Sequence, residues 1–557
     1  MISVILSWFY ISLICTLIGI GILSFLKDLK FSWIWYFMSG VVVITVYVEI
    51  FSIFGKIGAC AHLILLAAAV FIGVMYKEKI KELYKEYLPV VCSWEGFFYF
   101  CFIIFIAYFT SRGNFHTDTN LYHAQAIRQF EEYGILKGAG NLMNNFAYNS
   151  AYLAFASIFS LNWLLGQSLH TTTGLLELSM CMYAFHGLKD FKQHNSHITD
   201  LMKIGILFYV LVILTGSMSP ATDYATMLFV LFIITSWCEN LEGKRSLTVY
   251  ALLSVGAVYA MTLKFSASIL VLLVIYPAVY LIKGKKWKEI IGYIICGCII
   301  LSPFLIRNYF ISGWLLYPFE AIDLFRVEWK VPRNTLLTDS NQIKVWGRCL
   351  YDVEKVDWSV SQWFPVWWEH QERYEQMLIG AVVVGAILQF VMLIDRIAKK
   401  LKPRWELAVL QLAIWGNIAV WFFIAPFIRY GLAFLFAVIM ISVGTCISEK
   451  RYGFNSILTG GMLFCILVSV SPYWDNYITD AGVFVKQRLR EPYYFTQKDY
   501  DVVNMESIDI NGNIIYYSTE SGMNSYHMYP GTGSPGVIGR FALMGDRIED
   551  GFKSVSQ

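Results

Sequence analysis

Long apolar runs alternate with short polar connections over most of the chain. A helix needs roughly 20 apolar residues to cross a bilayer, so each run of about that length is a candidate span. The pattern predicts fourteen spans, near residues 3–25, 33–54, 57–76, 93–111, 168–187, 202–218, 222–239, 247–263, 266–282, 289–307, 376–394, 406–424, 428–447 and 454–472. The shorter apolar run 150–166 directly follows a polar stretch, and we interpret it as lying along the membrane interface.

The basic residues of the connections are unevenly divided between the two sides of this arrangement. Alternate connections carry 22 lysines and arginines, whereas the short connections on the other side hold only Lys56 and Lys264. Cationic loops resist translocation, so the basic set is predicted to be cytoplasmic. Counting 150–166 as a full span would invert every later loop and break the pattern. The N-terminus, the segments 112–167 and 308–375 and the tail 473–557 are therefore predicted to face outside.

Composition agrees with a multi-pass protein of a plasma or inner membrane. Hydrophobic residues make up 57% of the 557 and charged residues only 15%, well below the ~25% of soluble domains. The run 3–25 lacks a basic leader and a small-residue cleavage site, so we interpret it as a retained helix. A net charge of +3 gives no reason to expect nucleic acid as a partner, and the eleven cysteines form no CxxC pair that would indicate a zinc site or a disulfide framework.

The tail differs in composition from the rest of the chain. NGNIIYYST alternates like a strand after an Asn-Gly turn, and YPGTGSPG is rich in turn residues. We therefore divide the chain into a transmembrane domain, 1–472, and a small outside α/β domain, 473–557. The latter either caps a cleft and helps to choose an acceptor or only stabilises the protein.

The first large polar segment holds the densest candidate chemistry. It contains His116, Asp118, His123 and Arg128, and apolar residues three apart predict an amphipathic helix from about 120 to 133, ended by Gly134. One interpretation is that the residues around Asp118 simply cap this helix. The other is that Asp118 is a carboxylate at a membrane-facing cleft, where it takes a proton from an acceptor hydroxyl or holds a metal ion. His116 and His123 are also candidate metal ligands. However, they lack HxxxH spacing, and structural histidines at membrane interfaces are more common than metal ligands.

Four ionisable residues are predicted to lie at the outer ends of spans. They are Asp223 in SPATD, Lys264 in TLKFSA, Arg307 in RNYFISGWLLYP and Arg429 in APFIRYG. Ionisable groups at such depths are costly unless they are paired or functional. Two arginines and a lysine on one side form a candidate site for a lipid phosphate, because guanidinium binds phosphate through two parallel hydrogen bonds. The alternative is that the arginines only reach up to the lipid headgroups.

These strings, together with HTDTNLYHAQAIRQFEEYGILKGAGNLMNNFAYNS and WKVP, resemble the GT-C superfamily and a bacterial multi-pass branch with that fold. The resemblance covers roughly residues 110–435, with a weaker match in the tail at YPGTGSP and DGFK. It implies an all-α polytopic fold and an inverting glycosyltransferase that uses a polyprenyl-phosphate-linked sugar. By the same resemblance Asp118 is the catalytic acid of the first outside loop, and Arg307 lies near the lipid phosphate. The chain departs from the family in having four spans before this loop and no second acid beside Asp118.

We therefore expect transfer of a sugar to a glycan, lipid or protein acceptor outside the membrane. His116, His123, Arg128, Asp223, Lys264, Arg307 and Arg429 are the candidate substrate-binding residues, and a divalent cation is the one candidate cofactor. An O-antigen or capsule polymerase or ligase is an alternative that relies on arginines rather than an acid. A flippase or transporter is another, but it predicts inverted repeats and helices broken near the midplane, and the sequence shows neither.

Overall fold

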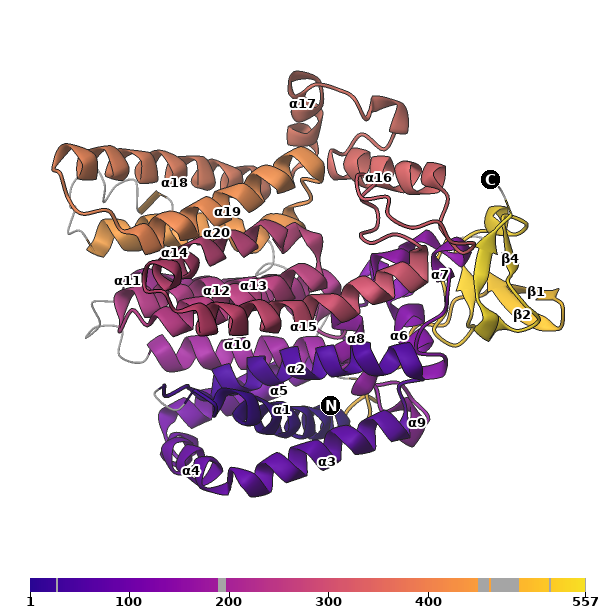
Figure 1. Ribbon diagram of the computed structural model, residues 1–557, viewed down its shortest axis with the longest axis horizontal. Helices are drawn as coiled ribbons and strands as arrows, with labels where there is room; N and C mark the ends of the chain where they lie inside the picture. The colour runs from indigo at the N-terminus through magenta and orange to yellow at the C-terminus, as the bar shows by residue number, and fades with distance from the viewer. Residues whose placement is uncertain (27–28, 189–196, 449–459, 462–489, 520–521, 556–557) are drawn as a thin grey trace.

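The structure, a computed structural model, describes residues 1–26, 29–188, 197–448, 460–461, 490–519 and 522–555. Its long helices lie side by side in one bundle, and short helices and strands gather at one end (Figure 1). The helices are α1 (Ile2–Leu23), α2 (Trp33–Phe54), α3 (Ala59–Met75), α4 (Lys77–Val91), α5 (Trp94–Arg112), α6 (Ala124–Glu132), α7 (Ala139–Leu142), α8 (Ala151–Ile158), α9 (Asn162–Leu165), α10 (Thr172–Leu188), α11 (His197–Ile213), α12 (Thr222–Glu242), α13 (Leu247–Leu263), α14 (Ile275–Lys283), α15 (Trp287–Ser312), α16 (Arg333–Gly347), α17 (Val360–His370), α18 (Arg373–Ala398), α19 (Trp405–Ile424) and α20 (Ile428–Ser448).

Ten helices of the described residues are long and apolar enough to cross a membrane. They are α1, α2, α5, α11, α12, α15, α18, α19, α20 and the 3₁₀ segment η4 (Phe265–Val274) continued by α14. The prediction of a polytopic helical membrane protein is thus confirmed, whereas its count of fourteen spans is not.

The remaining four predicted spans have separate explanations. Three of them, 57–76, 168–187 and 247–263, correspond to α3, α10 and α13, which are only 17 residues long. Of these, α3 meets the exposed amphipathic helix α4 at an 82° bend, so that pair could count as an eleventh, broken span. The fourth, 454–472, lies almost wholly outside the described residues, as does the proposed boundary at 472.

The run 150–166 forms two short helices, α8 and α9, and most of it does not lie on a surface, in contrast to the prediction. All eight residues of α8 are buried within the protein, and only the three apolar side chains of α9 are exposed. Ser150, just before α8, donates its hydroxyl to the carbonyl of Leu263 at the end of α13. Hydropathy cannot distinguish a segment buried within the protein from one that lies at the membrane interface. The predicted interfacial position of 150–166 was therefore wrong for α8.

Close helix contacts depend on small residues. A Cβ at Gly19 of α1 would lie 1.8 Å from the carbonyl oxygen of Tyr36, and one at Gly40 of α2 would lie 1.8 Å from that of Cys15. The two backbones therefore touch at both positions, as small residues allow in membrane bundles. Either glycine replaced by alanine would force the two helices apart.

The described C-terminal segment, after residue 490, forms two small β-sheets. A sheet of β1 (Glu506–Ile510), β2 (Asn513–Tyr517) and β3 (Gly531–Thr532) pairs β1 with β2 antiparallel and β2 with β3 parallel, and β4 (Phe541–Leu543) pairs with β5 (Phe552–Ser554). The predicted Asn-Gly turn is confirmed, because Asn511 and Gly512 have φ of 55° and 81°. No α-helix occurs among the described residues after 490, so the α part of the predicted α/β domain is not seen there.

The strands share one hydrophobic core with the first polar segment. Ile515, Phe541 and Phe552 pack with Leu136 and Phe146. We call the end of the bundle that carries α6–α9, α16 and these strands the loop end. The chain begins there too, since the amino group of Met1 donates to the carbonyl of Tyr493 at 2.7 Å. All the predicted outside segments thus gather at one end, apart from those that lie beyond the described residues.

The membrane sidedness of the loop end stays a prediction, and reporter fusions test it. Fusions after Lys81, Lys286 and Lys400 are expected to report cytoplasm, because they follow basic connections. Fusions at Asn145, Asp339 and Asn511 are expected to report the outside. A cytoplasmic signal at Asn145 would contradict both the sidedness and an outside reaction.

Candidate functional site

Four segments far apart in sequence meet at the loop end and bring ionisable side chains together. The segment after α5 carries His116 and Asp118, α12 begins beside Asp223, α13 ends at Lys264, and α20 begins beside Arg429. Each of the last three residues lies within one turn of a helix terminus, as the sequence predicted. We call these five residues the carboxylate cluster.

The segment that carries His116 is fixed against the junction of α11 and α12. The backbone amide of Asn114 donates to the carbonyl of Thr215 at 3.0 Å, and the amide of His116 donates to the Ser219 hydroxyl at 2.6 Å. The carbonyl of Ser219 in turn accepts from the Thr173 hydroxyl at the start of α10. Pro220 then ends the connection, and α12 starts two residues later. The SMSPATD string therefore positions both Asp223 and the loop that holds His116.

Arg429 is the centre of the cluster. Its Nε lies 3.2 Å from Asp223 Oδ2, its Nη2 lies 3.5 Å from Asp118 Oδ2, and its Nη1 lies 2.8 Å from His116 Nε2. Lys264 forms a second ion pair with Asp223 and lies over the ring of Tyr430, 3.6 Å from its centroid. Two carboxylates thus face two permanent cations.

His116 contacts both Arg429 and the backbone of Asp118. A guanidinium only donates, so Nε2 accepts from Arg429. Nδ1 lies 3.1 Å from the backbone nitrogen of Asp118 and 3.7 Å from Asp118 Oδ2. Burial, its largest influence, lowers the pKa of His116, so the ring is neutral at neutral pH. A neutral imidazole here holds the backbone of Asp118 beside Arg429 without adding another charge.

The two carboxylates have different surroundings. The side chain of Asp223 is only 3% exposed and is paired with both cations, whereas that of Asp118 is 19% exposed. Asp223 begins a helix, where the positive end of the macrodipole also stabilises a negative charge. Asp223 therefore anchors Arg429 and Lys264, and Asp118 is the acid that remains accessible to a reactant.

The capping interpretation of Asp118 is not what the structure shows. The predicted helix 120–133 is present as a π-helical turn, η1 (Thr119–His123), that continues into α6, and Gly134 follows it with φ of 77°. Asp118 occupies the N-cap position, but its side chain accepts no hydrogen bond from the first turn. Its carboxylate points to Arg429 instead.

Two predicted residues lie on the same helix but outside the cluster. His123 is fully buried beside the Tyr122 ring, and neither ring nitrogen has a hydrogen-bond partner among the described residues. Burial lowers the pKa of His123 to about 3, so it is a neutral packing residue. Arg128 pairs with Glu132 and lies over the ring of Tyr526, so it contacts the C-terminal segment.

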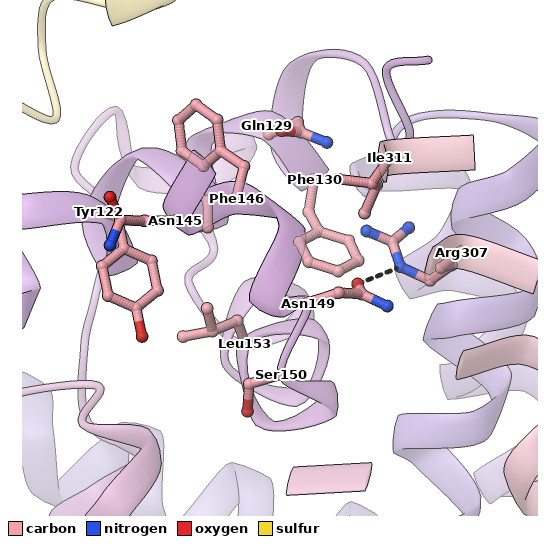
Figure 2. A pocket seen from close by; sticks show the side chains of 11 residues that line it. Tyr122, Gln129, Phe130, Asn145, Phe146, Asn149, Ser150, Leu153, Arg307 and Ile311 are labelled. Atoms are coloured by element: carbon pink, nitrogen blue, oxygen red, sulfur yellow. Dashed lines mark hydrogen bonds between the residues drawn. The ribbon is translucent and has the colours of Figure 1, made fainter. Parts of the chain in front are cut away.

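Arg307 lies in a different pocket, which Figure 2 shows. Its side chain is 1% exposed, its Nε donates to Asn149 Oδ1 at 3.1 Å, and its Nη1 donates to the Ser52 hydroxyl. The guanidinium lies over the ring of Phe130, 4.0 Å from the centroid. The adjoining cavity of about 20 Å³ has room for one water molecule but not for a phosphate headgroup. We therefore do not carry the predicted phosphate contact of Arg307 into the proposal below.

Sequence reasoning missed three residues that complete the cluster. They are Ser219, Tyr224, whose ring meets His116 edge-on at 5.8 Å, and Tyr430, which covers Lys264. Each lies within four residues of a residue that was singled out, so proximity in sequence was the available signal. Neutral hydroxyl groups in an apolar chain gave no separate indication of a role.

The cluster also contains donors suited to a metal ion. One ligand atom from each of His116, Asp118 and Asp223 lies within 4.8 Å of the others, and imidazole with carboxylates is a common set for divalent metals. Yet Arg429 contacts all three residues and Lys264 contacts Asp223. A divalent cation would have to displace these two cations, so the residues as arranged do not fit a metal.

Comparisons with known proteins identify the family but not the activity. Residues 1–436 match the model of a family described as a domain of unknown function (DUF8201). The chain belongs to this family. The matched region contains every residue of the carboxylate cluster, whereas the strands lie beyond it. No curated protein and no solved structure matches the chain.

Proposed function

We propose that this DUF8201 protein is a membrane glycosyltransferase that moves a sugar from a polyprenyl-phosphate-linked donor to an acceptor hydroxyl at the loop end. The observation that supports it best is the pairing of an accessible carboxylate, Asp118, with an arginine that a buried second acid, Asp223, holds in place. One group suits proton removal and the other suits phosphate binding. The resemblance of the sequence to GT-C enzymes supports the same assignment.

The reaction assigns one task to each group. The acceptor oxygen attacks the anomeric carbon of the sugar, its proton passes to the Asp118 carboxylate, and the bond from that carbon to the phosphate oxygen breaks. The leaving polyprenyl phosphate gains negative charge, which the guanidinium of Arg429 and the ammonium of Lys264 stabilise. His116 orients Asp118, and Asp223 keeps the two cations in place.

Substituting Arg429 tests the phosphate contact. The side chain is 37% exposed, so part of the guanidinium is open to a ligand. Arg429→Ala is expected to weaken donor binding more than Arg429→Lys, and Arg429→Lys should still be weaker than the parent, because lysine keeps the charge but loses the planar fork. The measurement is retention of a radiolabelled polyprenyl-phosphate hexose by purified protein.

Arg333→Ala is the matched control, since Arg333 pairs with Glu320 on the exposed surface of the same end of the molecule. It should bind donor as the parent does. Unchanged binding in both Arg429 variants would contradict the proposed phosphate contact.

Removing metal ions with a chelator tests whether the transfer reaction needs a metal ion at the carboxylate cluster. Because Arg429 and Lys264 already neutralise both carboxylates, EDTA is expected to leave the transfer rate unchanged. The measurement compares rates of purified protein with EDTA and with added Mg²⁺ or Mn²⁺. A rate abolished by EDTA and restored by Mn²⁺ would show that the ion displaces Arg429.

A further inference from the structure

The helix that follows Asp118 begins with the π-helical turn η1, and this turn changes the usual hydrogen-bond ladder. The amide of Ala124 donates to the carbonyl of Thr119, five residues before it, whereas an α-helix would direct it to the carbonyl of Asn120. The turn therefore accommodates one extra residue, and the Asn120 carbonyl loses its usual donor. Single π-helical turns are rare, and they occur frequently at functional sites.

The C-terminal segment supplies donors to this turn. Asn524 is buried, its backbone amide donates to the carbonyl of Asn120 at 2.6 Å, and its side-chain Nδ2 donates to the carbonyl of Leu121 at 2.8 Å. The Asn120 side chain also donates to Asp501 Oδ2 at 3.2 Å. One residue of the C-terminal segment thus satisfies the carbonyl that the π-helical turn frees and holds the carbonyl that follows it.

A separate contact anchors the same segment to α6. Gln125 is fully buried, and its Nε2 donates to the carbonyls of Ser525 and Met528 at 2.9 and 2.8 Å. Its Oε1 accepts from the amide of Gly531 at 3.0 Å, at the start of β3. These bonds do not involve the side chain of Asn524. A change at that side chain should therefore leave the segment attached to α6.

The π-helical turn determines the direction in which Asp118 points. The amide of His116 is fixed to Ser219 before the turn, and Gln125 fixes α6 after it. If η1 became α-helical, the extra residue would have to be taken up between these fixed points, and Asp118 would turn by about 100° around the helix axis. Its carboxylate would then leave Arg429, whose Nη2 lies 3.5 Å from it.

We propose that Asn524 is a positioning residue, which holds the π-helical turn and thereby keeps the carboxylate of Asp118 beside Arg429. This assignment rests on the proposed role of Asp118 as the base. Asn524 acts through the backbone of η1 and not on a reactant. The family match ends at residue 436, so the support comes from a part of the chain beyond it. The C-terminal segment therefore contributes to the reaction as well as to stability.

Two asparagines of the C-terminal segment provide a matched test in the full-length protein. Asn524→Leu keeps the size of the side chain and the backbone amide but removes the donor to Leu121. Its kcat for sugar transfer is expected to fall by about 10–100-fold, because a misplacement of ~1 Å at a reacting group costs about 100-fold. The KM for the donor and the thermal unfolding midpoint should match those of the parent, since the substitution leaves Arg429 and the Gln125 anchor unchanged.

The control is Asn513→Leu. The side chain of Asn513 donates to the carbonyl of Asp546 at 2.7 Å, within the C-terminal segment and away from η1. Its kcat, KM and unfolding midpoint should all stay close to the parental values. If Asn524→Leu does not elute as a folded monodisperse protein, Asn524→Ala replaces it, because alanine removes the same donor and keeps the backbone amide.

A second measurement does not depend on sugar transfer. Cryo-electron microscopy of the parent and of the Asn524 variant, each bound to an antibody fragment, is expected to show Asp118 beside Arg429 in the parent and turned away in the variant. This result with an inactive parent would overturn the proposed function and still support the positioning role. The positioning role is overturned if Asp118 keeps its contact with Arg429 in the variant, or if an active parent and the variant share the same kcat.

Discussion

Replacing Asp118 by asparagine is expected to slow sugar transfer by about 10²–10⁴-fold, the contribution typical of a general base. The amide keeps the shape of the carboxylate and can accept a hydrogen bond from Arg429, but it cannot take the acceptor's proton. The amount of protein and its thermal unfolding midpoint should stay close to those of the parent, because Asp118 makes no capping bond whose loss would destabilise α6.

The control for this prediction is Asp223→Asn. Asp223 is buried between Lys264 and Arg429, so its neutralisation should lower both transfer and thermal stability. Asp118→Asn that transfers sugar at the parental rate would contradict a role as base. Lost activity accompanied by the same loss of stability as in Asp223→Asn would indicate a structural role.

Replacing Arg307 by alanine is expected to destabilise the protein by about 3–5 kcal/mol, the usual cost of truncating a large, fully buried side chain. Glu49 lies on α2, three residues before Ser52, is fully buried and is electrostatically coupled to Arg307. Without the guanidinium, Glu49 loses this electrostatic partner, and Asn149 and Ser52 lose a donor. The measurement is the loss of folded protein on thermal or SDS titration.

A double variant tests whether Glu49 contributes a charge. Glu49→Gln combined with Arg307→Ala should be about as stable as Arg307→Ala alone, because a fully buried carboxyl group with no cation beside it takes up a proton. The folded fraction of Arg307→Ala should still bind donor lipid. Normal stability with impaired donor binding would instead restore the phosphate role that the sequence suggested for Arg307.

Hydropathy predicted the positions of most helices in the bundle. The errors of that prediction have a common origin. Span positions such as 33–54 and 428–447 match α2 and α20 almost residue for residue. Hydropathy reports only that a segment avoids water. It therefore could not distinguish α8, which is enclosed by protein, from an interfacial segment, nor a 17-residue helix such as α10 from a longer span.

The cluster was predictable in part, for a topological reason. Alternation of spans places Asp118, Asp223, Lys264 and Arg429 at one end of the bundle, although Asp118 and Arg429 are 311 residues apart. The same argument placed Arg307 there as well, and α15 does end at that side. However, an apolar helix has no polar face that would indicate which way each side chain points around the helix axis. The sequence therefore could not show that Arg307 points to Asn149 and not to Asp118.

The most direct test of the proposed function follows both products of a single reaction. Purified protein in liposomes receives polyprenyl-phosphate-linked mannose or glucose, labelled in the sugar and in the lipid, together with membrane extract as the source of acceptor. We expect the parent to release one polyprenyl phosphate for each sugar that appears on the acceptor, and Asp118→Asn to release neither at a comparable rate. Movement of intact donor across the liposome membrane with no cleavage of the sugar–phosphate bond would contradict the account and identify a flippase instead.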